Sequence, residues 1–497
     1  MTLPSWYLLV PVFVPMLCGL AVAFLPALKE ERARNGLVSL ALVLQVLLVV
    51  PLLVAPETEQ PLFRLSDALT LFLRTDDTGR FFAAVMAFVW CAAGLYSFEY
   101  MHEEEHLPRY YAFYLLTLGV LMGLCFSGSI VTFYMFYELM TLLSVPLVMH
   151  TMRKDAVAGG IKYLIYSVTG ASLVLMGIFV LSPYVSTFDF TPGGVLDPQK
   201  VVGHESLVLA FAFLMILGFG AKAGMFPLHG WLPTAHPAAP SPASAVLSGI
   251  ITKAGALGML RLVYCFLGAD LLRGTWVQTA FLCLTLFTVF MGSLLAWHEK
   301  LLKKRLAYSS VSQVSYVLTG LATLHPVGVV GALLHVAAHA LIKDTLFMSA
   351  GAIIHKTHHT RVEELDGVGK QMPVTMWCFT LASLGLVGIP PCLGFLSKWY
   401  LAQGALSMSG TPAVFRWLVP VVLLISALLT AGYLFPVSIR AFFPGRKEDG
   451  SLKYFERCEP SAVMLVPMVI LTALILLLGM FPNGLIAFFE RVASSVL

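Results

Sequence analysis

About fourteen apolar runs, each long enough to cross a lipid bilayer, dominate this chain. They lie near residues 4–27, 36–55, 79–101, 108–127, 129–150, 156–184, 205–226, 241–268, 275–297, 306–324, 327–355, 372–406, 413–440 and 461–490. Because lipid offers no hydrogen bonds to a backbone, a spanning segment of this length folds as an α-helix. The sequence therefore predicts an all-α polytopic membrane protein with about 14 transmembrane helices.

The composition supports a membrane protein and excludes several other classes. Hydrophobic residues make up 58% of the chain and charged residues 12%, whereas soluble domains carry about 25% charged residues. The net charge of +4 predicts no nucleic-acid partner, and the eight scattered cysteines predict neither a metal site nor a disulfide framework. No phosphate-binding loop, haem motif or iron–sulfur motif is visible, so we expect no cofactor and no catalytic residue. The first apolar run lacks a basic segment before it, which predicts a first span rather than a cleavable signal peptide.

Basic residues are distributed unevenly among the predicted loops. The loops that leave odd-numbered runs hold 18 Lys and Arg residues, whereas the loops that leave even-numbered runs hold 6. Since cytoplasmic loops carry the excess of positive charge, the loops that leave odd-numbered runs are predicted to lie in the cytoplasm. We therefore expect a multi-pass protein of the cell inner (plasma) membrane with both termini outside.

Helix-breaking residues interrupt the seventh and twelfth runs. The seventh ends in FPLHGWLPTAHPAAPSP, and the twelfth contains GIPPCLG at 388–394; the eleventh carries a further candidate break, the charged pair Lys343 and Asp344. Proline removes a backbone donor, and broken backbone at membrane depth is tolerated where protein or a water-filled cavity satisfies it. Breaks at corresponding places in two halves are typical of transporters built from inverted repeats. The seventh and twelfth runs lie five apart, which predicts two five-helix units with broken helices 7 and 12.

These units divide the chain into four parts. They are N-terminal transmembrane helices 1–3 at 1–107, a first five-helix repeat (helices 4–8) at 108–268, a second five-helix repeat (helices 9–13) at 269–440, and a cytoplasmic loop with the last transmembrane helix at 441–497. Beyond a lysine beside each break, the two units share no clear sequence identity, so the repeat is a prediction of structure alone.

Charged residues inside the apolar runs are the first candidates for function. Glu138, Lys222 and Lys253 each interrupt such a run, where a charge costs about 2.5–3.5 kcal/mol on an insertion scale. Burial disfavours the charge of a lysine and a nearby carboxylate restores it, so a pair formed by Glu138 and Lys222 can hold or release a proton. The alternative is a static ion pair between two helices, although small residues pack helices in lipid at lower cost.

Three residues of the eleventh run share one predicted helix face. His335, His339 and Lys343 are spaced i, i+4 and i+8. Histidine titrates near neutral pH, which suits a proton relay. The alternatives are hydrogen bonds that pack helices and a metal site, for which no third ligand is apparent.

Lys253 and Lys398 are predicted to be further stations on the same route. Lys253 lies near the centre of its run, and snorkelling toward the interface is the alternative. Lys398 follows the break in the twelfth run and is a candidate exit station toward the outer face. In the alternative interpretation, Lys398 anchors the interface together with Trp399 and Tyr400.

Three more residues are candidate linkers between the stations. His229 and His236 flank the proline-rich break after the seventh run, and in the alternative interpretation both are merely satisfied polar groups. Lys304 is predicted to face the interior, within a segment, HEKLLKKRLAYSSVSQ, that is otherwise predicted to be a solvated basic surface.

At these residues the chain resembles the antiporter-like membrane subunits shared by respiratory complex I (NADH-quinone oxidoreductase), Mrp-type cation/proton antiporters and membrane-bound hydrogenases. The matching segments are FYELMTLLSVPLV, GFGAKAGMFPLHGWLPTAHPAAPSPASAVLSGIITKAG, LLKKRLAYSSVSQ, HVAAHALIKDTLFMSAG and GIPPCLGFLSKW. The resemblance covers roughly residues 108–406, and the second segment is long and highly specific.

The resemblance implies a fourteen-span fold with two inverted five-helix repeats and a central hydrophilic axis. That axis would consist of Glu138, Lys222, Lys253, His335, His339, Lys343 and Lys398. With a lysine at the twelfth-run station, the chain resembles the D-type antiporter subunit and some complex I subunits rather than the complex I member with glutamate there. The length fits a D-type or hydrogenase-type subunit best. The implied partners are other membrane subunits and H⁺, with Na⁺ in the antiporters, and any quinone would bind through partner subunits.

The function predicted in this way is ion translocation by one subunit of a larger membrane complex. The subunit would move protons, or exchange them for Na⁺, and the movement would be coupled to redox chemistry or to a counter-ion gradient. A subunit of this kind catalyses no reaction alone. The alternatives are a stand-alone cation/proton antiporter and a structural spacer that moves no ions.

Overall fold

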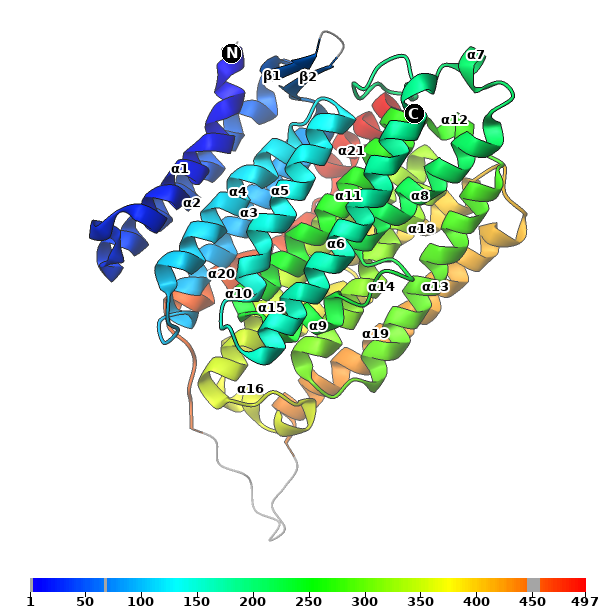
Figure 1. The fold of residues 1–497 in the computed structure, drawn as a ribbon. Coiled ribbons are helices and arrows are strands. Elements are labelled where there is room, and N and C mark those ends of the chain that lie inside the picture. Colours follow the sequence, from blue (N-terminus) through cyan, green and yellow to red (C-terminus); the bar gives the residue numbers. More distant parts are fainter. Residues whose placement is uncertain (1–2, 67–68, 445–455) are drawn as a thin grey trace.

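The computed structural model describes residues 3–66, 69–444 and 456–497, and it shows a bundle of long helices (Figure 1). Three basic residues counted among the loop charges, Arg446, Lys447 and Lys453, lie outside these ranges. Within the described ranges, 12 helices are long and apolar enough to cross a membrane. The predicted helical membrane fold is confirmed.

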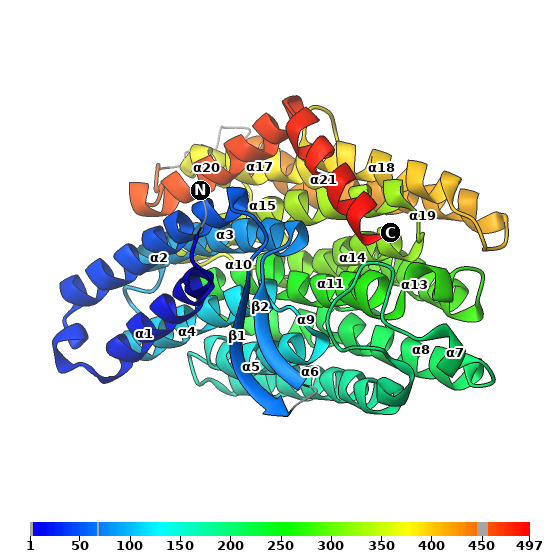
Figure 2. The same ribbon diagram turned by 90° about the horizontal axis from the view of Figure 1, so that it is seen from above.

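The helices are numbered in the order in which they occur in the chain. Their bounds are α1 (Val10–Phe24), α2 (Glu31–Val54), α3 (Asp77–Tyr100), α4 (Leu107–Cys125), α5 (Ile130–Val148), α6 (Lys154–Leu181), α7 (Pro198–Val201), α8 (Glu205–Ala223), α9 (Leu232–Ala238), α10 (Ser241–Val246), α11 (Thr252–Leu260), α12 (Ala269–Leu272), α13 (Trp276–His298), α14 (Leu302–Ala322), α15 (Pro326–Thr357), α16 (Val368–Gln371), α17 (Pro373–Val387), α18 (Leu393–Ser407), α19 (Val414–Phe442), α20 (Ala462–Met480) and α21 (Asn483–Val496). Seen from above, α10, α11, α14 and α15 lie in the middle, with α5, α6 and α8 on one side and α17, α19 and α20 on the other (Figure 2).

Two of the fourteen predicted spans fall outside the set of 12 for different reasons. Helix α14 has 21 residues, but serines, threonine, glutamine and basic residues make it more polar than its neighbours. The twelfth predicted span is divided into α17 and α18, which have 15 residues each. Both segments lie among the spanning helices, so the fourteen-helix organisation is retained.

The predicted breaks in the seventh and twelfth spans are present. Helix α8 ends at Ala223, where Gly224 takes a left-handed conformation with φ of 80°. Helix α17 ends at Val387, where Gly388 does the same with φ of 92°. A residue with a side chain is strained in this conformation, so glycine at both positions is what ends each helix.

The break expected in the eleventh span is absent. Helix α15 runs without interruption over 32 residues and includes both Lys343 and Asp344. This prediction was wrong because a charged side chain leaves the backbone N–H in place, whereas proline removes it.

The eighth span contains two stretches of π-helix that were not predicted from the sequence. They cover Leu247–Ile251 and Arg261–Leu267, on either side of α11. The whole span, Ser241–Leu267, is buried inside the bundle. Stretches of π-helix are rare and occur frequently at functional sites, and Lys253 stands next to the first of them.

Two further elements differ from the expected organisation. A β-hairpin pairs β1 (Glu59–Ser66) with β2 (Leu69–Arg74) in antiparallel register, with Glu59 opposite Arg74. The last predicted span, 461–490, ends early: α20 stops at Met480, and α21 forms a separate helix whose Phe489 ring lies 4.7 Å from that of Phe81. The hairpin and both chain ends lie at the same end of the bundle (Figure 1).

A close contact between α6 and α8 positions the first candidate lysine. A Cβ atom added to Gly170 would lie 2.6 Å from the carbonyl oxygen of Gly218, and one added to Gly218 would lie 2.5 Å from that of Gly170. Small residues of this kind allow helix backbones to approach closely in membranes. One turn beyond this contact, Lys222 faces α6.

Candidate functional site

Lys222 is completely buried and fully hydrogen-bonded. Its Nζ donates to Thr141 Oγ1 at 2.8 Å on α5, and to Tyr163 OH at 3.0 Å and Ser167 Oγ at 2.9 Å on α6. An ammonium group has three donors, and each of them has a neutral acceptor here. The site can therefore hold a charged lysine without a carboxylate in direct contact.

The predicted direct pair between Glu138 and Lys222 is not formed. Glu138 is half-buried on α5 and accepts a hydrogen bond from Tyr134 OH at 3.2 Å, one turn earlier on the same helix. The two charges interact electrostatically across the intervening side chains. A direct contact was expected because both residues interrupt apolar runs. The sequence does not show that three hydroxyl groups take up all the hydrogen bonds of the Lys222 ammonium, so that Glu138 is not in contact with it.

Lys253 forms the centre of a second buried cluster. Its Nζ donates to the carbonyl oxygen of Ser248 at 2.7 Å and lies 2.5 Å from His339 Nδ1 on α15. Ser248 belongs to the π-helical stretch, and its hydroxyl lies 2.6 Å from that of Ser310 on α14. Lys253 is buried near the middle of the bundle, so it does not snorkel to an interface.

Lys343 also contacts helix α14. It is completely buried, and its Nζ donates to the carbonyl oxygen of Leu306 at 3.0 Å and to the hydroxyl of Ser309. Ser309 and Ser310 are neighbours in the chain, so α14 contacts both buried lysines, Lys343 directly and Lys253 through Ser248.

The two histidines of α15 continue from Lys253 toward the twelfth span. The ring centroids of His335 and His339 are 5.9 Å apart, which confirms that the two residues share a helix face. His335 Nδ1 lies 2.8 Å from Ser397 Oγ on α18, and its ring stacks on that of Tyr316 at 5.2 Å. In both histidines, Nε2 has no hydrogen-bond partner among the described residues.

Lys398 ends this series at the break between α17 and α18. Its Nζ donates to the carbonyl oxygens of Leu386 at 2.6 Å and Val387 at 2.7 Å, the last two residues of α17. It also lies over the ring of Tyr316, 5.3 Å from the centroid. Lys398 therefore points into the bundle, whereas the neighbouring Trp399 is the residue that faces outward.

Helix α14 supplies polar groups that the sequence analysis placed on the surface. The segment predicted to be a solvated basic face begins outside the bundle, but its serine-rich part is buried. The buried polar residues of this part are Ser309, Ser310, Ser312, Gln313 and Ser315. The prediction was wrong because the basic residues at the start of the segment outweighed the hydroxyl groups, which alternate with valines in SSVSQVS and were the available signal.

The candidate linkers have different environments. His236 is completely buried, and neither of its ring nitrogens has a hydrogen-bond partner among the described residues. Its ring lies 6.2 Å from that of Trp231, which is in turn 4.7 Å from that of Tyr163 beside Lys222. His229 is half-buried and stacks on Phe226 at 5.9 Å. His236 is thus connected to the Lys222 cluster through the ring of Trp231, whereas the ring contact of His229 with Phe226 lies outside the cluster.

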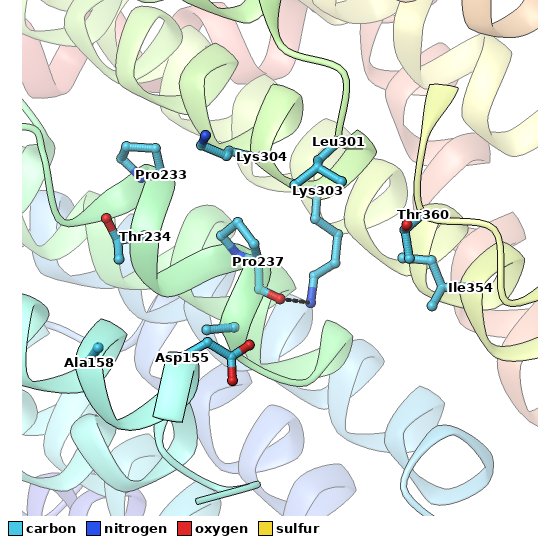
Figure 3. Close-up of a pocket in the computed structure, with 11 residues that line it drawn as sticks. Asp155, Ala158, Pro233, Thr234, Pro237, Leu301, Lys303, Lys304, Ile354 and Thr360 are labelled. Carbon is cyan, nitrogen blue, oxygen red and sulfur yellow. Dashed lines mark hydrogen bonds between the residues drawn. The ribbon is translucent and has the colours of Figure 1, made fainter. Parts of the chain in front are cut away.

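The lysine of the basic segment that enters the protein is Lys303, not Lys304. Lys304 is half-buried and forms an ion pair with Glu299 at 2.8 Å. Lys303 is buried and donates to the carbonyl oxygen of Ala239 at 2.5 Å and that of Pro237 at 3.4 Å. It lines a cavity of about 550 Å³ between α6, α9 and the start of α14 (Figure 3). Adjacent residues of a helix point about 100° apart, so a choice between neighbours is decided by packing.

A partly buried ion pair lies outside the predicted axis. Arg261, in the second π-helical stretch, donates to both carboxylate oxygens of Asp76 at 2.6 and 2.7 Å. Asp76 also caps α3 by accepting from the Gly79 N–H at 2.7 Å. The pair joins the eighth span to the start of α3. Nothing in the sequence around Arg261 separates it from a residue at a helix end.

Comparison with known proteins places this arrangement in one family. The family model described as "NADH:quinone oxidoreductase/Mrp antiporter, TM" matches residues 127–430. Subunit N of the NADH-quinone oxidoreductase of Desulforudis audaxviator is 34% identical over 422 residues, which cover 81% of this chain and 80% of that protein. Hydrogenase-4 component B of Escherichia coli is 31% identical over 86% of this chain and 64% of its own length. The D-type subunit of the Na⁺/H⁺ antiporter of Bacillus subtilis is 25% identical over 86% of this chain and 84% of its own.

Solved structures show the same fold. A chain of the Mrp complex from Dietzia sp. matches with a TM-score of 0.87 and 20% identity, and the match covers 100% of this chain and 98% of that chain. A chain of respiratory complex I from Thermus thermophilus matches with a TM-score of 0.78 and 21% identity, covering 99% of this chain and 100% of that one. From the family model and the 34% identity, the chain belongs to the family of membrane subunits shared by NADH:quinone oxidoreductases and Mrp antiporters.

Proposed function

We propose that this chain is the ion-translocating membrane subunit of a multi-subunit complex, and that it moves protons, or exchanges them for Na⁺, along its buried lysines and histidines. The observation that carries the proposal is a series of buried ionisable groups: Lys253 Nζ lies 2.5 Å from His339 Nδ1, the rings of His339 and His335 lie 5.9 Å apart, and the Tyr316 ring lies between His335 and Lys398. Lys253 and both histidines belong to spanning helices, and Lys398 lies at the break of the twelfth span. Ionisable residues at this depth are costly and mark ion and proton routes.

The first half of the route begins with Glu138 and Lys222. Lys222 keeps its proton while the hydroxyls of Thr141, Tyr163 and Ser167 accept from it and the charge of Glu138 acts on it. A change in the charge or position of Glu138 changes how readily the ammonium loses a proton. Because Glu138 is only half-buried on the side of α5, a neighbouring subunit has access to this control.

The second half of the route passes the proton between nitrogen atoms. His339 Nδ1 and Lys253 Nζ lie at hydrogen-bond distance, so a proton can move between amine and imidazole without a change in backbone. The free Nε2 atoms of both histidines are available to further donors and acceptors. Lys398 would then be the exit station, where the carbonyl oxygens at the end of α17 favour the charged form.

The route has an expected orientation in the membrane. The complex would lie in the plasma membrane, with both termini outside and the basic loops in the cytoplasm. Residues 108–268 and 269–440 would form the two inverted repeats, with one broken helix each. The names of the relatives support either redox chemistry or a cation gradient as the coupled process.

The test is ion transport by the whole complex in vesicles, followed with pH-sensitive and Na⁺-sensitive dyes. We expect Lys222→Ala to lower transport by at least about tenfold while the complex assembles, because it removes a station that no neighbouring cation replaces. Lys300→Ala is the matched control, since Lys300 forms a surface ion pair with Glu363 at 3.3 Å and its loss should leave transport unchanged.

The possible results separate transport from a structural role. Unaltered transport in an assembled Lys222→Ala complex would contradict the proposal and favour a structural spacer. Loss of the protein from the membrane would also favour a structural role. Transport by the isolated polypeptide would favour a stand-alone antiporter, and the Na⁺ dye shows whether Na⁺ is moved.

A further inference from the structure

Asp344 is a buried carboxylate with no hydrogen-bond partner among the described residues. It lies on α15 directly after Lys343, its exposed fraction is 0%, and both of its oxygens lack a partner. The great majority of buried polar side chains are hydrogen-bonded, and an unsatisfied one requires an explanation. Burial of an isolated charge is more costly still, so this residue is expensive for the fold to keep.

The structure makes room for Asp344 beside the first π-helical stretch. A Cβ atom added to Gly249 would lie 1.5 Å from Asp344 Oδ2, so the carboxylate occupies the space that a side chain at position 249 would fill. The preceding residue, Ser248, supplies the carbonyl oxygen that accepts from Lys253 Nζ. The carboxylate and the ammonium therefore lie against neighbouring residues of one helical turn.

Lys253 is the cation whose charge acts on Asp344. The same lysine also acts on Lys343 and His339 of α15. Tyr114 on α4 also interacts with the carboxylate. No ion pair within 4.0 Å joins Asp344 to Lys253 among the described residues, so the two groups meet only after a side-chain rotation.

We propose that Asp344 is an ion-path residue that exchanges a proton with Lys253, an inference that rests on the proposed function. In the step, one proton leaves Lys253 Nζ and bonds to an Asp344 carboxylate oxygen. An ammonium and a carboxylate become an amine and a carboxylic acid, and the pair stays neutral throughout. The step needs no other reactant.

This exchange gives Lys253 a second state. An amine at Lys253 can accept a proton from His339, whose Nδ1 lies 2.5 Å away, whereas an ammonium cannot. Because the pair of Lys253 and Asp344 carries no net charge in either form, the change avoids leaving an isolated charge in the interior. Asp344 would thus control how readily Lys253 loses its proton, as Glu138 does for Lys222, but from a position inside the bundle.

The test compares variants in the whole complex in vesicles. Asp344→Asn keeps the shape and removes the acid, and we expect at least about tenfold slower transport with normal assembly. Asp344→Glu keeps the acid but adds a methylene against Gly249, so it should transport faster than Asp344→Asn. Thr345→Val is the matched control, because the hydroxyl of Thr345 is buried next to Asp344 and bonds only to the Leu341 carbonyl oxygen.

A double variant separates partnership from packing. If Asp344 acts through Lys253, Lys253→Met/Asp344→Asn should be no slower than Lys253→Met alone, whereas independent residues would multiply their losses. Should Asp344→Asn not assemble, the double variant should restore assembly by removing the unpaired lysine, and its failure to do so would overturn the inference.

Other outcomes are also decisive. Wild-type transport in Asp344→Asn, or slower transport in Asp344→Glu than in Asp344→Asn, would overturn the inference. If these occur while Lys222→Ala still abolishes transport, the proposed function stands and only the role of Asp344 is lost. If Lys222→Ala also transports normally, the proposed function itself is wrong.

Discussion

Replacement of Lys253 by methionine is expected to lower ion transport by at least about 100-fold while the complex still assembles. Lys253 contacts His339 and the Ser248 carbonyl oxygen, and it interacts with Asp344. It therefore connects the π-helical span electrostatically and by a hydrogen bond to α15. Methionine has a similar length, fills the same space and cannot carry a proton.

Assembly should survive because Lys253 forms no ion pair within 4.0 Å among the described residues, so methionine breaks no direct salt bridge and fills the same space. Thr252→Val is the control: Thr252 is the preceding residue, is equally buried and bonds to the same Ser248 carbonyl oxygen at 2.7 Å. Transport at the wild-type rate in Lys253→Met would show that ions do not pass through this cluster.

Replacement of Arg261 by methionine should destabilise the folded protein by about 1.5–3 kcal/mol, because it removes both charge-assisted hydrogen bonds to the partly buried Asp76 carboxylate. Arg261 donates two hydrogen bonds to that carboxylate, at 2.6 and 2.7 Å, and its side chain is 4% exposed. The measurement is thermal unfolding of the purified complex, together with the amount of this protein retained in the membrane.

An exposed pair nearby in the chain provides the comparison. Arg273 forms an ion pair with Asp270 in which the carboxylate is 90% exposed, and such pairs contribute about 0–1 kcal/mol. Arg273→Met should therefore shift unfolding far less than Arg261→Met. Adding Asp76→Asn to Arg261→Met should recover part of the lost stability. Equal shifts in the unfolding temperature of Arg261→Met and Arg273→Met would show that the pair of Arg261 and Asp76 contributes no more stability than the exposed pair.

The features that could be predicted from the sequence are those that single residues determine by themselves. Proline and glycine mark where α8 and α17 end, because each residue restricts or frees the backbone directly. Lysines inside apolar runs stand out because lipid penalises them. For this reason the spans, the two breaks and the inward positions of Lys222 and Lys398 follow from the sequence.

The remaining features depend on which side chains meet. Whether Lys303 or Lys304 is buried depends on the carbonyl oxygens of Pro237 and Ala239, about 65 residues earlier in the chain. Taken one at a time, the serines of α14 have no sequence feature that separates them from surface serines. Their contacts with the buried lysine clusters in the folded protein are what distinguish them. The π-helical stretches have no composition of their own, because they differ from α-helix by one hydrogen-bond register.

The break in the twelfth span also exposes its lysine to the electric field of the membrane. Helix α17 has 15 residues, a length of about 22 Å, which is shorter than the hydrocarbon core of about 30 Å. Lys398, which donates to the last carbonyl oxygens of α17, therefore lies within the membrane dielectric. A proton that moves between Lys398 and either surface crosses only part of the voltage drop, and its energy changes by less than about 2.3 kcal/mol for each 100 mV. On the proposed route, the fraction of Lys398 that is protonated would therefore depend on voltage as well as on pH.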